Sequence, residues 1–363
     1  MTGQPDPSIF AGDRVRAARL LRGVSQTSLA KSLGLTQGAI SQIESGRLSP
    51  SGAQIDAIAL ALNLPRSFFD AVPPDLPPVT LRFRKQSRAS ATDTNRATQL
   101  VAEAYRIVWT LVHERDGYLP PSLPLAIDQV VTDDDIERLA AATRTTLGLD
   151  AASPVRHMTR ALERAGVVVA PLSLSDDEDH AETVGHFGAS CWPGPGDPAL
   201  IGYFHGAAGD RQRFTLAHEV GHLVLHSRRT FVADPEGEAN RFAGALLVPR
   251  DAYQEFMGDS APTLRDFAMM KAKWGVSIQA LIMRGGHLGL IDETRKTSLF
   301  KQISARGYRK NEPVNVHPEE PVLFAKLIES RYGSTKNVYT LAGPRVGLDS
   351  FMLAGLAPRR AAR

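Results

Sequence analysis

The feature that most constrains the fold of this chain is the run RFTLAHEVGHLVLH, which contains His218-Glu219-Val220-Gly221-His222. Histidines at this spacing project from one face of an α-helix, where both imidazoles can reach a single Zn²⁺ at about 2.0–2.1 Å. The intervening glutamate then lies beside the open position of the metal. Apolar residues flank the motif, so we expect a buried helix with His218 and His222 as metal ligands. A packed helix that carries two histidines by chance is the alternative.

A catalytic zinc site needs a third protein ligand and leaves its fourth position to water. A polar stretch, SRRTFVADPEGE, separates the motif from EANRFAGALLVP, in which apolar residues return at helical spacing. We predict that Glu238 is the third ligand, with Glu236 as the alternative. An acid favoured by the helix macrodipole is the interpretation of Glu238 without a metal. His226 lies on the ligand face but about 6 Å further along the helix axis, so we expect it to pack or to support a ligand.

These two segments, RQRFTLAHEVGHLVLH and EANRFAGALLVP, resemble the ImmA/IrrE family of metallopeptidases over roughly Asp133 to Leu290. The resemblance implies Zn²⁺ on His218, His222 and Glu238, with Glu219 as general base. The metal would lower the pKa of its bound water towards about 7 and polarise the scissile carbonyl. Glu219 would take the proton of that water and pass it to the leaving amine.

Upstream of the motif, the periodicity predicts helices at about 133–147 and 153–165, followed by strands in VVVAPL, HFGASCW and ALIGYF. With the zinc helix they give a small α+β core. Tyr203, His205 and His186 lie in or next to these strands. Each is a candidate donor to the oxyanion of a peptide hydrolysis, with ordinary packing or surface placement as the alternative.

The amino-terminal segment carries a second, independent signal. Apolar residues recur at helical spacing from Val15 to Leu62, and the helices are short. Ser25 can cap a helix at 26–33, Gly34 can supply a left-handed turn, and Thr36 can cap a helix at 37–44. Two short helices joined by a tight turn form a helix-turn-helix. With its Ser-Gln-x-x-Leu-Ala and Ile-Ser-x-Ile-Glu-x-Gly signatures, the stretch resembles the Cro/CI-like (XRE-type) repressor domain of five short helices.

That resemblance implies a double-stranded DNA operator as partner, with the second helix of the motif in the major groove. The residues that we expect to contact DNA are Gln26, Thr36, Gln37, Ser41, Gln42 and Arg47. Gln37 and Gln42 can each read an adenine edge through paired hydrogen bonds, whereas Gln26 and Arg47 would contact the backbone. A solvated helix face is the plain alternative for these polar residues. We expect Glu44 to be structural.

Composition sets the class and the compartment. The chain has 363 residues, of which 43% are hydrophobic, and this is enough for two or three packed domains. Its one cysteine, Cys191, excludes an intramolecular disulfide, and no run approaches the ~20 apolar residues that span a bilayer. The sequence MTGQPDPSIF is not a signal peptide, so a cytoplasmic protein without a membrane partner is expected. Because the net charge is only +3, attraction to DNA must come from local basic patches such as LRFRKQSR.

The predicted fold class is mainly α with α+β: an all-helical Cro/CI-like head, a zincin-like α+β metallopeptidase core and a helical C-terminal part. Pro-rich AVPPDLPPVT marks the clearest joint. The predicted division is a helix-turn-helix domain at 1–70, a linker and connecting helix at 71–125, and the zinc core at 126–255. A helical segment at 256–300 and a basic region at 301–363 complete it. The segment at 256–300 imitates a second helix-turn-helix, with DNA contact or plain packing as its two interpretations.

The function predicted from these signals is that of a repressor-like, sequence-specific transcriptional regulator that carries a zinc-dependent endopeptidase. The peptidase would cleave the protein itself or a partner Cro/CI-like repressor in response to a signal. Since one short recognition helix buries little surface, a homodimer is expected. Two alternatives stay open: a DNA-binding regulator whose zinc-site domain is a sensor without proteolysis, and an antitoxin-like regulator.

Overall fold

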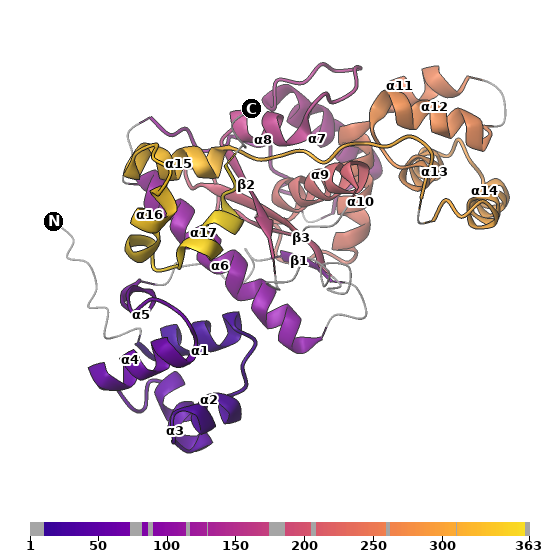
Figure 1. Cartoon of the computed structure of the whole chain (residues 1–363). Coiled ribbons are helices and arrows are strands. Elements are labelled where there is room, and N and C mark those ends of the chain that lie inside the picture. Colours follow the sequence, from indigo (N-terminus) through magenta and orange to yellow (C-terminus); the bar gives the residue numbers. More distant parts are fainter. Residues whose placement is uncertain are drawn as a thin grey trace. The chain divides into compact units, whose positions relative to one another are not determined.

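The computed structural model of the protein describes residues 11–72, 82–85, 90–113, 117–128, 130–173, 186–204, 208–258, 262–309 and 311–359. Contacts between residues divide the chain into two compact units. The first holds Met1–Tyr118, Ala170–His186 and Val322–Arg363, and the second holds Leu119–Val169 and Phe187–Pro321. Figure 1 labels the elements of both. Along the chain, the two segments of the second unit therefore alternate with the three segments of the first.

The first unit is built from short helices. Its elements are α1 (Ala11–Leu21), α2 (Gln26–Ser32), α3 (Gln37–Glu44), α4 (Gly52–Ala61), α5 (Ser67–Asp70), β1 (Arg82–Lys85), α6 (Ala91–His113), α15 (Leu323–Tyr332), α16 (Val338–Val346) and α17 (Ser350–Leu356). The first five form the predicted head. Ser25 caps α2 by accepting the Ser28 N–H, and Thr36 caps α3 by accepting the Ala39 N–H. Gly34 between them has φ +66°, which is the left-handed turn expected from the sequence.

The head packs on helices from distant parts of the chain within the same unit. Arg14 of α1 donates to Glu103 of α6, and α15 packs on α6 as well. Gly347, which follows α16, has φ +78°, and a Cβ there would lie 3.1 Å from the Cα of Phe68 in α5. The division predicted from the sequence, with separate segments at 1–70, 71–125 and 301–363, stays a prediction about which segments fold alone.

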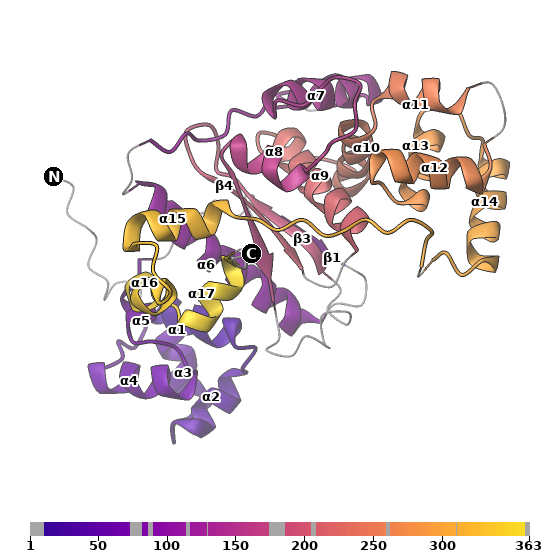
Figure 2. The ribbon, with the colours of Figure 1, turned by 45° about the horizontal axis from the view of Figure 1, so that its top comes forward.

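The second unit carries the sheet and the helix with the histidine motif. Its elements are α7 (Asp133–Thr146), α8 (Met158–Arg164), β2 (Val167–Leu172, which crosses the unit boundary), β3 (His186–Cys191, which begins at it), β4 (Ala199–Phe204), α9 (Gly209–His226), α10 (Pro235–Leu247), α11 (Arg250–Met257), α12 (Leu264–Trp274), α13 (Ile278–His287) and α14 (Glu293–Ala305). The strands are adjacent in the order β3-β4-β2. β3 pairs antiparallel with β4, with Ser190 opposite Ile201. β4 is buried along its whole length, and α9 packs on it, as the view in Figure 2 also shows. The mostly helical fold with a small sheet confirms the predicted fold class.

A close contact between α9 and α10 sets the site. Gly221 of α9 is buried, and a Cβ built on it would lie 3.1 Å from the Cα and 3.2 Å from the carbonyl oxygen of Ala239 in α10. Real Cβ atoms rarely approach backbone so closely, so a larger residue at position 221 would push the helices apart. The glycine therefore allows the first turn of α10 to approach the histidine motif.

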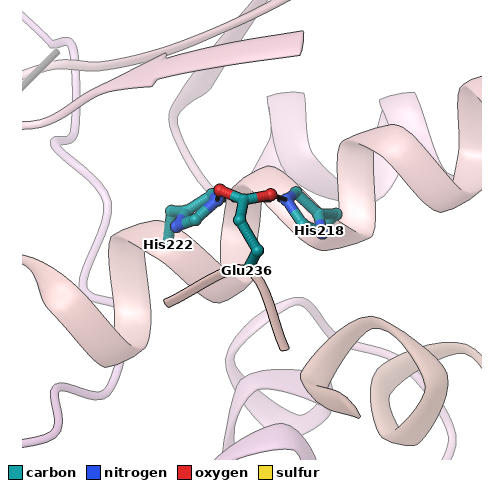
Figure 3. A group of neighbouring side chains, drawn as sticks. All are labelled: His218, His222 and Glu236. Atoms are coloured by element: carbon teal, nitrogen blue, oxygen red, sulfur yellow. Dashed lines mark hydrogen bonds and ion pairs between the residues drawn. The ribbon is translucent and has the colours of Figure 1, made fainter. Parts of the chain in front are cut away.

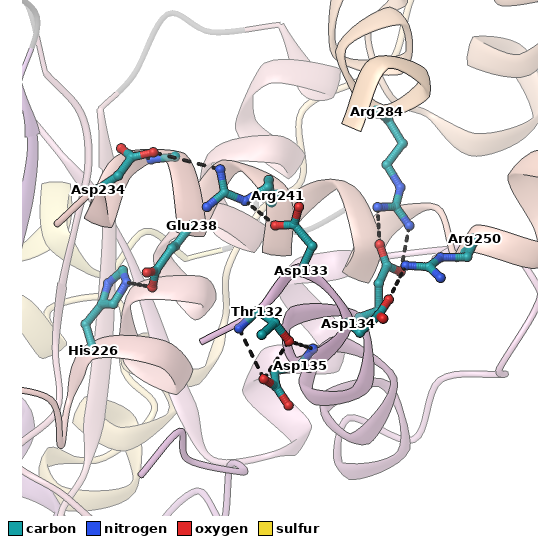
Figure 4. A network of polar contacts seen from close by, with 12 residues as sticks. Thr132, Asp133, Asp134, Asp135, His226, Asp234, Glu238, Arg241, Arg250 and Arg284 are labelled. Carbon is teal, nitrogen blue, oxygen red and sulfur yellow. Dashed lines mark hydrogen bonds and ion pairs between the residues drawn. The ribbon is translucent and has the colours of Figure 1, made fainter. Parts of the chain in front are cut away.

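Acidic residues in the amino-terminal part of α7 pair with arginines of three other helices of the same unit. Asp133 pairs with Arg241 of α10 at 2.9 Å, and Asp134 pairs with Arg250 of α11 at 2.8 Å. Arg284 of α13 donates to both carboxylate oxygens of Glu137. Figure 4 shows the pairs of Asp133 with Arg241 and of Asp134 with Arg250. The pair of Asp133 and Arg241 joins α7 to α10, the helix whose first turn carries Glu236 and Glu238.

The helix-turn-helix-like segment forms α12 and α13, with Gly275 at φ +66° and Ser277 as cap. The amino end of α13 is covered, because the Glu312 carboxylate accepts the N–H groups of Ile278 and Gln279 at 2.7 and 3.3 Å. A recognition helix needs this end free for base edges. The arrangement favours the packing interpretation of this segment.

In the described part of the chain, no helix combines the length and the apolar character that a membrane crossing requires.

Candidate metal centre and nucleic-acid interface

The two histidines of the motif converge on one point. Four residues apart on α9, the side chains of His218 and His222 are 0% and 2% exposed, and their Nε2 atoms lie 3.0 Å apart (Figure 3). Two ligands at about 2.0–2.1 Å from a tetrahedral ion have a separation of about 3.4 Å. The helical spacing thus gives the pair that the sequence predicts.

A carboxylate completes the cluster, and it belongs to Glu236. Its two oxygens lie 3.4 Å from His218 Nε2 and 3.3 Å from His222 Nε2, and Figure 3 shows it bridging the rings. Burial raises the pKa of Glu236, but the neighbouring rings of His218 and His222 outweigh that effect and hold the pKa well below its usual value. Among the described residues, His218, His222 and Glu236 are the group of His, Cys, Asp and Glu side chains that could hold a metal.

Glu238, the third ligand predicted from the sequence, lies elsewhere. Its carboxylate accepts from His226 Nε2 at 3.1 Å and from two nitrogens of Arg229. Because side chains two positions apart on a helix diverge by about 200°, the two carboxylates reach different points along α9. Asp234 caps α10 and Pro235 opens it; Glu236 then reaches His218 and His222, whereas Glu238 reaches His226 further along α9. The structure brings the sequence alternative, not the first choice, to the histidines.

The chemistry of this donor set fits a divalent cation. His218 Nδ1 lies 3.0 Å from the Asn240 side-chain oxygen, an acceptor, so Nδ1 carries the proton and Nε2 presents a lone pair. A lone pair, a second imidazole nitrogen and a carboxylate at one point repel each other unless a cation lies between them. Imidazole and carboxylate are ligands that zinc prefers. The residues present therefore match the predicted zinc site in type and number.

Glu219 lies beside the cluster, fully buried. The Ser190 hydroxyl of β3 donates to its Oε2 at 2.7 Å, while Oε1 has no hydrogen-bond partner among the described residues. Burial raises the pKa of Glu219, against the lowering effect of His222 and His218. Gly188, two positions before Ser190 and on the same strand face, leaves room: a Cβ there would lie 2.6 Å from Oε1. A buried carboxylate oxygen without a partner is what a general base needs.

Ser190 is a site residue that the sequence reasoning missed. Its strand was predicted, but a lone serine carries no signal of its own. The strand alternation of Gly188 and Ser190 could have pointed to it, because a small residue and a hydroxyl then share one face. Of the oxyanion candidates, Tyr203 is buried and burial raises its pKa to about 12, so it is a protonated phenol at neutral pH. The His186 side chain and His205 lie outside the described residues.

The predicted DNA-contacting residues lie on α2 and α3 or close to the ends of α3. Thr36, Gln37, Gln42 and Arg47 are exposed, and Gln26 and Ser41 are half-buried. Gln37 donates to the Gln26 side chain at 2.7 Å, and Gln26 donates to Glu44 at 2.8 Å. Glu44 is buried and accepts two hydrogen bonds from Arg19. The expected structural role of Glu44 agrees with this geometry, and a polar network orients Gln26 and Gln37 before any DNA binds.

Comparison with known proteins decides the family. Residues 15–69 match the helix-turn-helix family, and residues 163–284 match the peptidase M78 family, described as the IrrE N-terminal-like domain. Over 64 residues the chain is 39% identical to the uncharacterized HTH-type transcriptional regulator YazB of Bacillus subtilis, and the match spans 18% of this chain and 90% of YazB. The chain belongs to the HTH-type transcriptional regulators. This regulator carries an XRE-type DNA-binding domain at its amino terminus and an IrrE N-terminal-like domain after it.

Two further likenesses are weaker. The regulator is 37% identical over 67 residues to an uncharacterized HTH-type transcriptional regulator of Sinorhizobium medicae, which covers 18% of this chain. It spans 48% of the length of that relative. The crystal structure of Bacillus thuringiensis PlcR in complex with the peptide PapR7 and DNA aligns with 84% of this chain and 99% of that one, at 11% identity and a TM-score of 0.17. A score this low supports no conclusion about this regulator.

Proposed function

We propose that this regulator binds an operator through its head and carries a zinc-dependent endopeptidase in its IrrE-like domain. One observation carries the peptidase part: His218, His222 and Glu236 meet at one point, next to the buried, half-partnered carboxylate of Glu219. Two imidazoles and a carboxylate with an open fourth position are the ligand set of hydrolytic zinc sites. A purely structural zinc site would be closed by four protein ligands.

When bound, zinc supplies Lewis acidity to water and to the scissile carbonyl. The residues of the chain do the rest. Glu219 accepts the proton of the attacking water at Oε1 and delivers it to the leaving amine, so the proton count is unchanged over the cycle. Ser190 donates to the other oxygen, Oε2, and fixes the rotamer of the base. Burial of Glu219 raises its pKa and so makes the carboxylate a stronger base.

The substrate that we propose is a Cro/CI-like DNA-binding domain, either that of the regulator itself or that of a partner repressor. Fusion of head and peptidase in one chain gives a high effective concentration for such a reaction. Cleavage of the head from its unit would end operator binding. The gene controlled by that operator would thereby be switched on, in the compartment that contains the DNA.

A direct test follows the protein by mass spectrometry. Zinc-loaded and metal-free protein are incubated alone and with a separate XRE-type repressor, with and without single-stranded or damaged DNA. We expect one discrete fragment that depends on zinc, and its loss in the Glu219→Gln variant. If intact mass persists under every condition, the peptidase proposal is wrong.

The chain order favours one second candidate, a sensor that regulates DNA binding without proteolysis. The two segments of the second unit lie between α6 and α15, and both of these helices belong to the unit that contains the head. A ligand on the second unit would thus act on chain connections that return to the DNA-binding unit. In that case zinc-loaded and metal-free protein differ in operator affinity while the chain stays intact.

For DNA, we propose a homodimer on a pseudo-palindrome, with each head reading one half-site through Gln37 and Gln42. Both side chains are exposed on α3, the second helix of the motif. Gln26 and Arg47 are proposed to contact the phosphate backbone. Two heads on half-sites about 34–36 Å apart would match one turn of the duplex.

A further inference from the structure

A line of buried contacts runs away from the candidate metal centre. His222 Nδ1 lies 2.9 Å from His226 Nδ1, and His226 Nε2 lies 3.1 Å from Glu238 Oε2. Arg229 donates to both oxygens of the same carboxylate. The side chains of His226 and Arg229 are 0% and 2% exposed, and that of Glu238 is 10% exposed. Figure 4 shows His226 and Glu238 facing each other across the α9–α10 interface.

The donors and acceptors in this line permit one proton arrangement of neutral rings. The Glu238 carboxylate accepts from Arg229, so His226 Nε2 donates to it. A neutral His226 then has a bare Nδ1, which can only accept. The atom that faces it, His222 Nδ1, therefore carries the proton. The lone pair of His222 is left on Nε2, the nitrogen that faces His218 and Glu236.

We propose that Glu238, His226 and Arg229 form a positioning relay that fixes the ring orientation and the tautomer of His222 for metal binding. The proposal rests on the metal site of the proposed function. Asn240 fixes the ring orientation and tautomer of His218 in the same way, through one direct hydrogen bond. The relay gives a role to the residue predicted to be a ligand and to the third histidine of HEVGHLVLH. Hydrogen-bond partners that hold the remaining ring nitrogen raise metal affinity, and their loss typically costs about 10–100-fold.

Three variants separate the relay from plain packing. His226→Phe keeps an aromatic ring of similar volume and leaves the Arg229–Glu238 ion pair in place, but it can neither accept nor donate. His226→Gln can do both, because its amide oxygen can accept from His222 and its NH₂ can donate to Glu238. Glu238→Gln removes the carboxylate. Ser190→Ala is the matched control, since it removes a buried hydrogen bond to Glu219, which is not one of the three proposed metal ligands.

The first measurement is the ring ¹⁵N spectrum of the metal-free full-length protein. We expect wild-type His222 to be protonated on Nδ1 alone. In His226→Phe and Glu238→Gln, the His222 signals should move to a mixture of tautomers, while those of His218 stay unchanged. The spectrum does not depend on metal or on proteolysis. If His222 already has mixed tautomers in the wild type, or keeps one in His226→Phe, the relay is refuted.

The second measurement is zinc affinity by competition with a chelator. We expect His226→Phe and Glu238→Gln to raise the dissociation constant about 10–100-fold, and His226→Gln to restore most of the affinity. The variant that combines His226→Phe with Glu238→Gln should bind zinc no more weakly than the weaker-binding of the two single variants, because the relay acts as one unit. Equal losses in His226→Gln and His226→Phe would assign the effect to packing and overturn the proposal. Should Glu238→Gln not fold, the two His226 variants alone decide.

These results are independent of proteolysis. If the wild type binds zinc and the variants lose affinity as expected, but no peptide is cut, the relay stands and the peptidase proposal fails. If cleavage occurs while tautomer and affinity are insensitive to the variants, the peptidase proposal stands and the relay fails.

Discussion

Arg14 of α1 and Glu103 of α6 form a buried ion pair 89 positions apart in the sequence, and each side chain is 2% exposed. Arg106 donates to the same carboxylate at 2.8 Å. The Arg14 guanidinium also stacks on Phe68, with 3.8 Å between its carbon and the ring centroid. The DNA-binding head is thus joined to the long helix of its unit by a charge cluster at its core.

The first prediction is that acid destabilises this unit through Glu103. Burial raises the pKa of Glu103, but Arg106 and Arg14 outweigh that effect and lower it from 4.5 to about 2. Because the folded pKa is the lower one, the stabilisation is complete above about pH 4.5 and is lost as the pH falls towards 2. The shift corresponds to about 3 kcal/mol at most. Denaturant titrations at several pH values measure it.

Glu103→Gln is the matching variant. It leaves Arg14 buried without a carboxylate, so we expect a loss of about 3–5 kcal/mol at pH 7 and a flatter dependence on acid. The exposed pair Arg66–Asp70 supplies the control: Asp70→Asn should cost at most about 1 kcal/mol. A Glu103→Gln protein with wild-type stability at pH 7 would show that the cluster contributes nothing.

The second prediction concerns metal content. We expect about one zinc ion per chain after purification without chelator, measured by elemental analysis. His222→Ala should lose the ion. Glu236→Gln should weaken metal binding and change the visible spectrum of the cobalt-substituted protein, because it removes the carboxylate ligand. Under the same conditions, Glu238→Gln should keep the spectrum. Loss of the spectrum in Glu238→Gln but not in Glu236→Gln would return the ligand role to Glu238.

The third prediction separates metal binding from chemistry. Glu219→Gln keeps the shape of the side chain but cannot accept a proton, so zinc content should be unchanged while the cleavage rate falls by about 10²–10⁴-fold. Ser190→Ala should lower the rate less, since the base remains but its rotamer is freer. Metal analysis and time courses on the same preparations provide the comparison. A Glu219→Gln variant that cuts at the parental rate would exclude Glu219 as the base.

The fourth prediction concerns DNA. Gln37→Ala should weaken binding to the operator by roughly 1–3 kcal/mol and leave binding to random DNA nearly unchanged. Arg47→Ala should weaken both by a similar factor and lower the salt slope by about 1. Gel-shift titrations at several salt concentrations distinguish the two patterns. An equal effect of Gln37→Ala on both DNAs would mean that Gln37 reads no base.

Local rules made much of this regulator predictable from its sequence. The caps at Ser25 and Thr36, the left-handed Gly34 and the apolar spacing predict the head, because each acts within a few residues of chain. The pairing of His218 and His222 was equally predictable from the sequence, since the α-helix alone places residues four apart on one face. In both cases the geometry that matters is set inside one element or between two adjacent ones.

The tertiary structure decided what depends on the mutual placement of elements. Glu236 and Glu238 both lie in the first turn of α10, and the sequence could not say which one reaches His218 and His222. The angle at which α10 meets α9 settles it, and that angle is set by the close approach at Gly221 and by the ion pairs with α7. Ser190 and Glu103 lie 29 and 89 positions from the residues that they hold, Glu219 and Arg14. No periodicity along the chain encodes such a pairing, because it exists only after the helices and strands have packed.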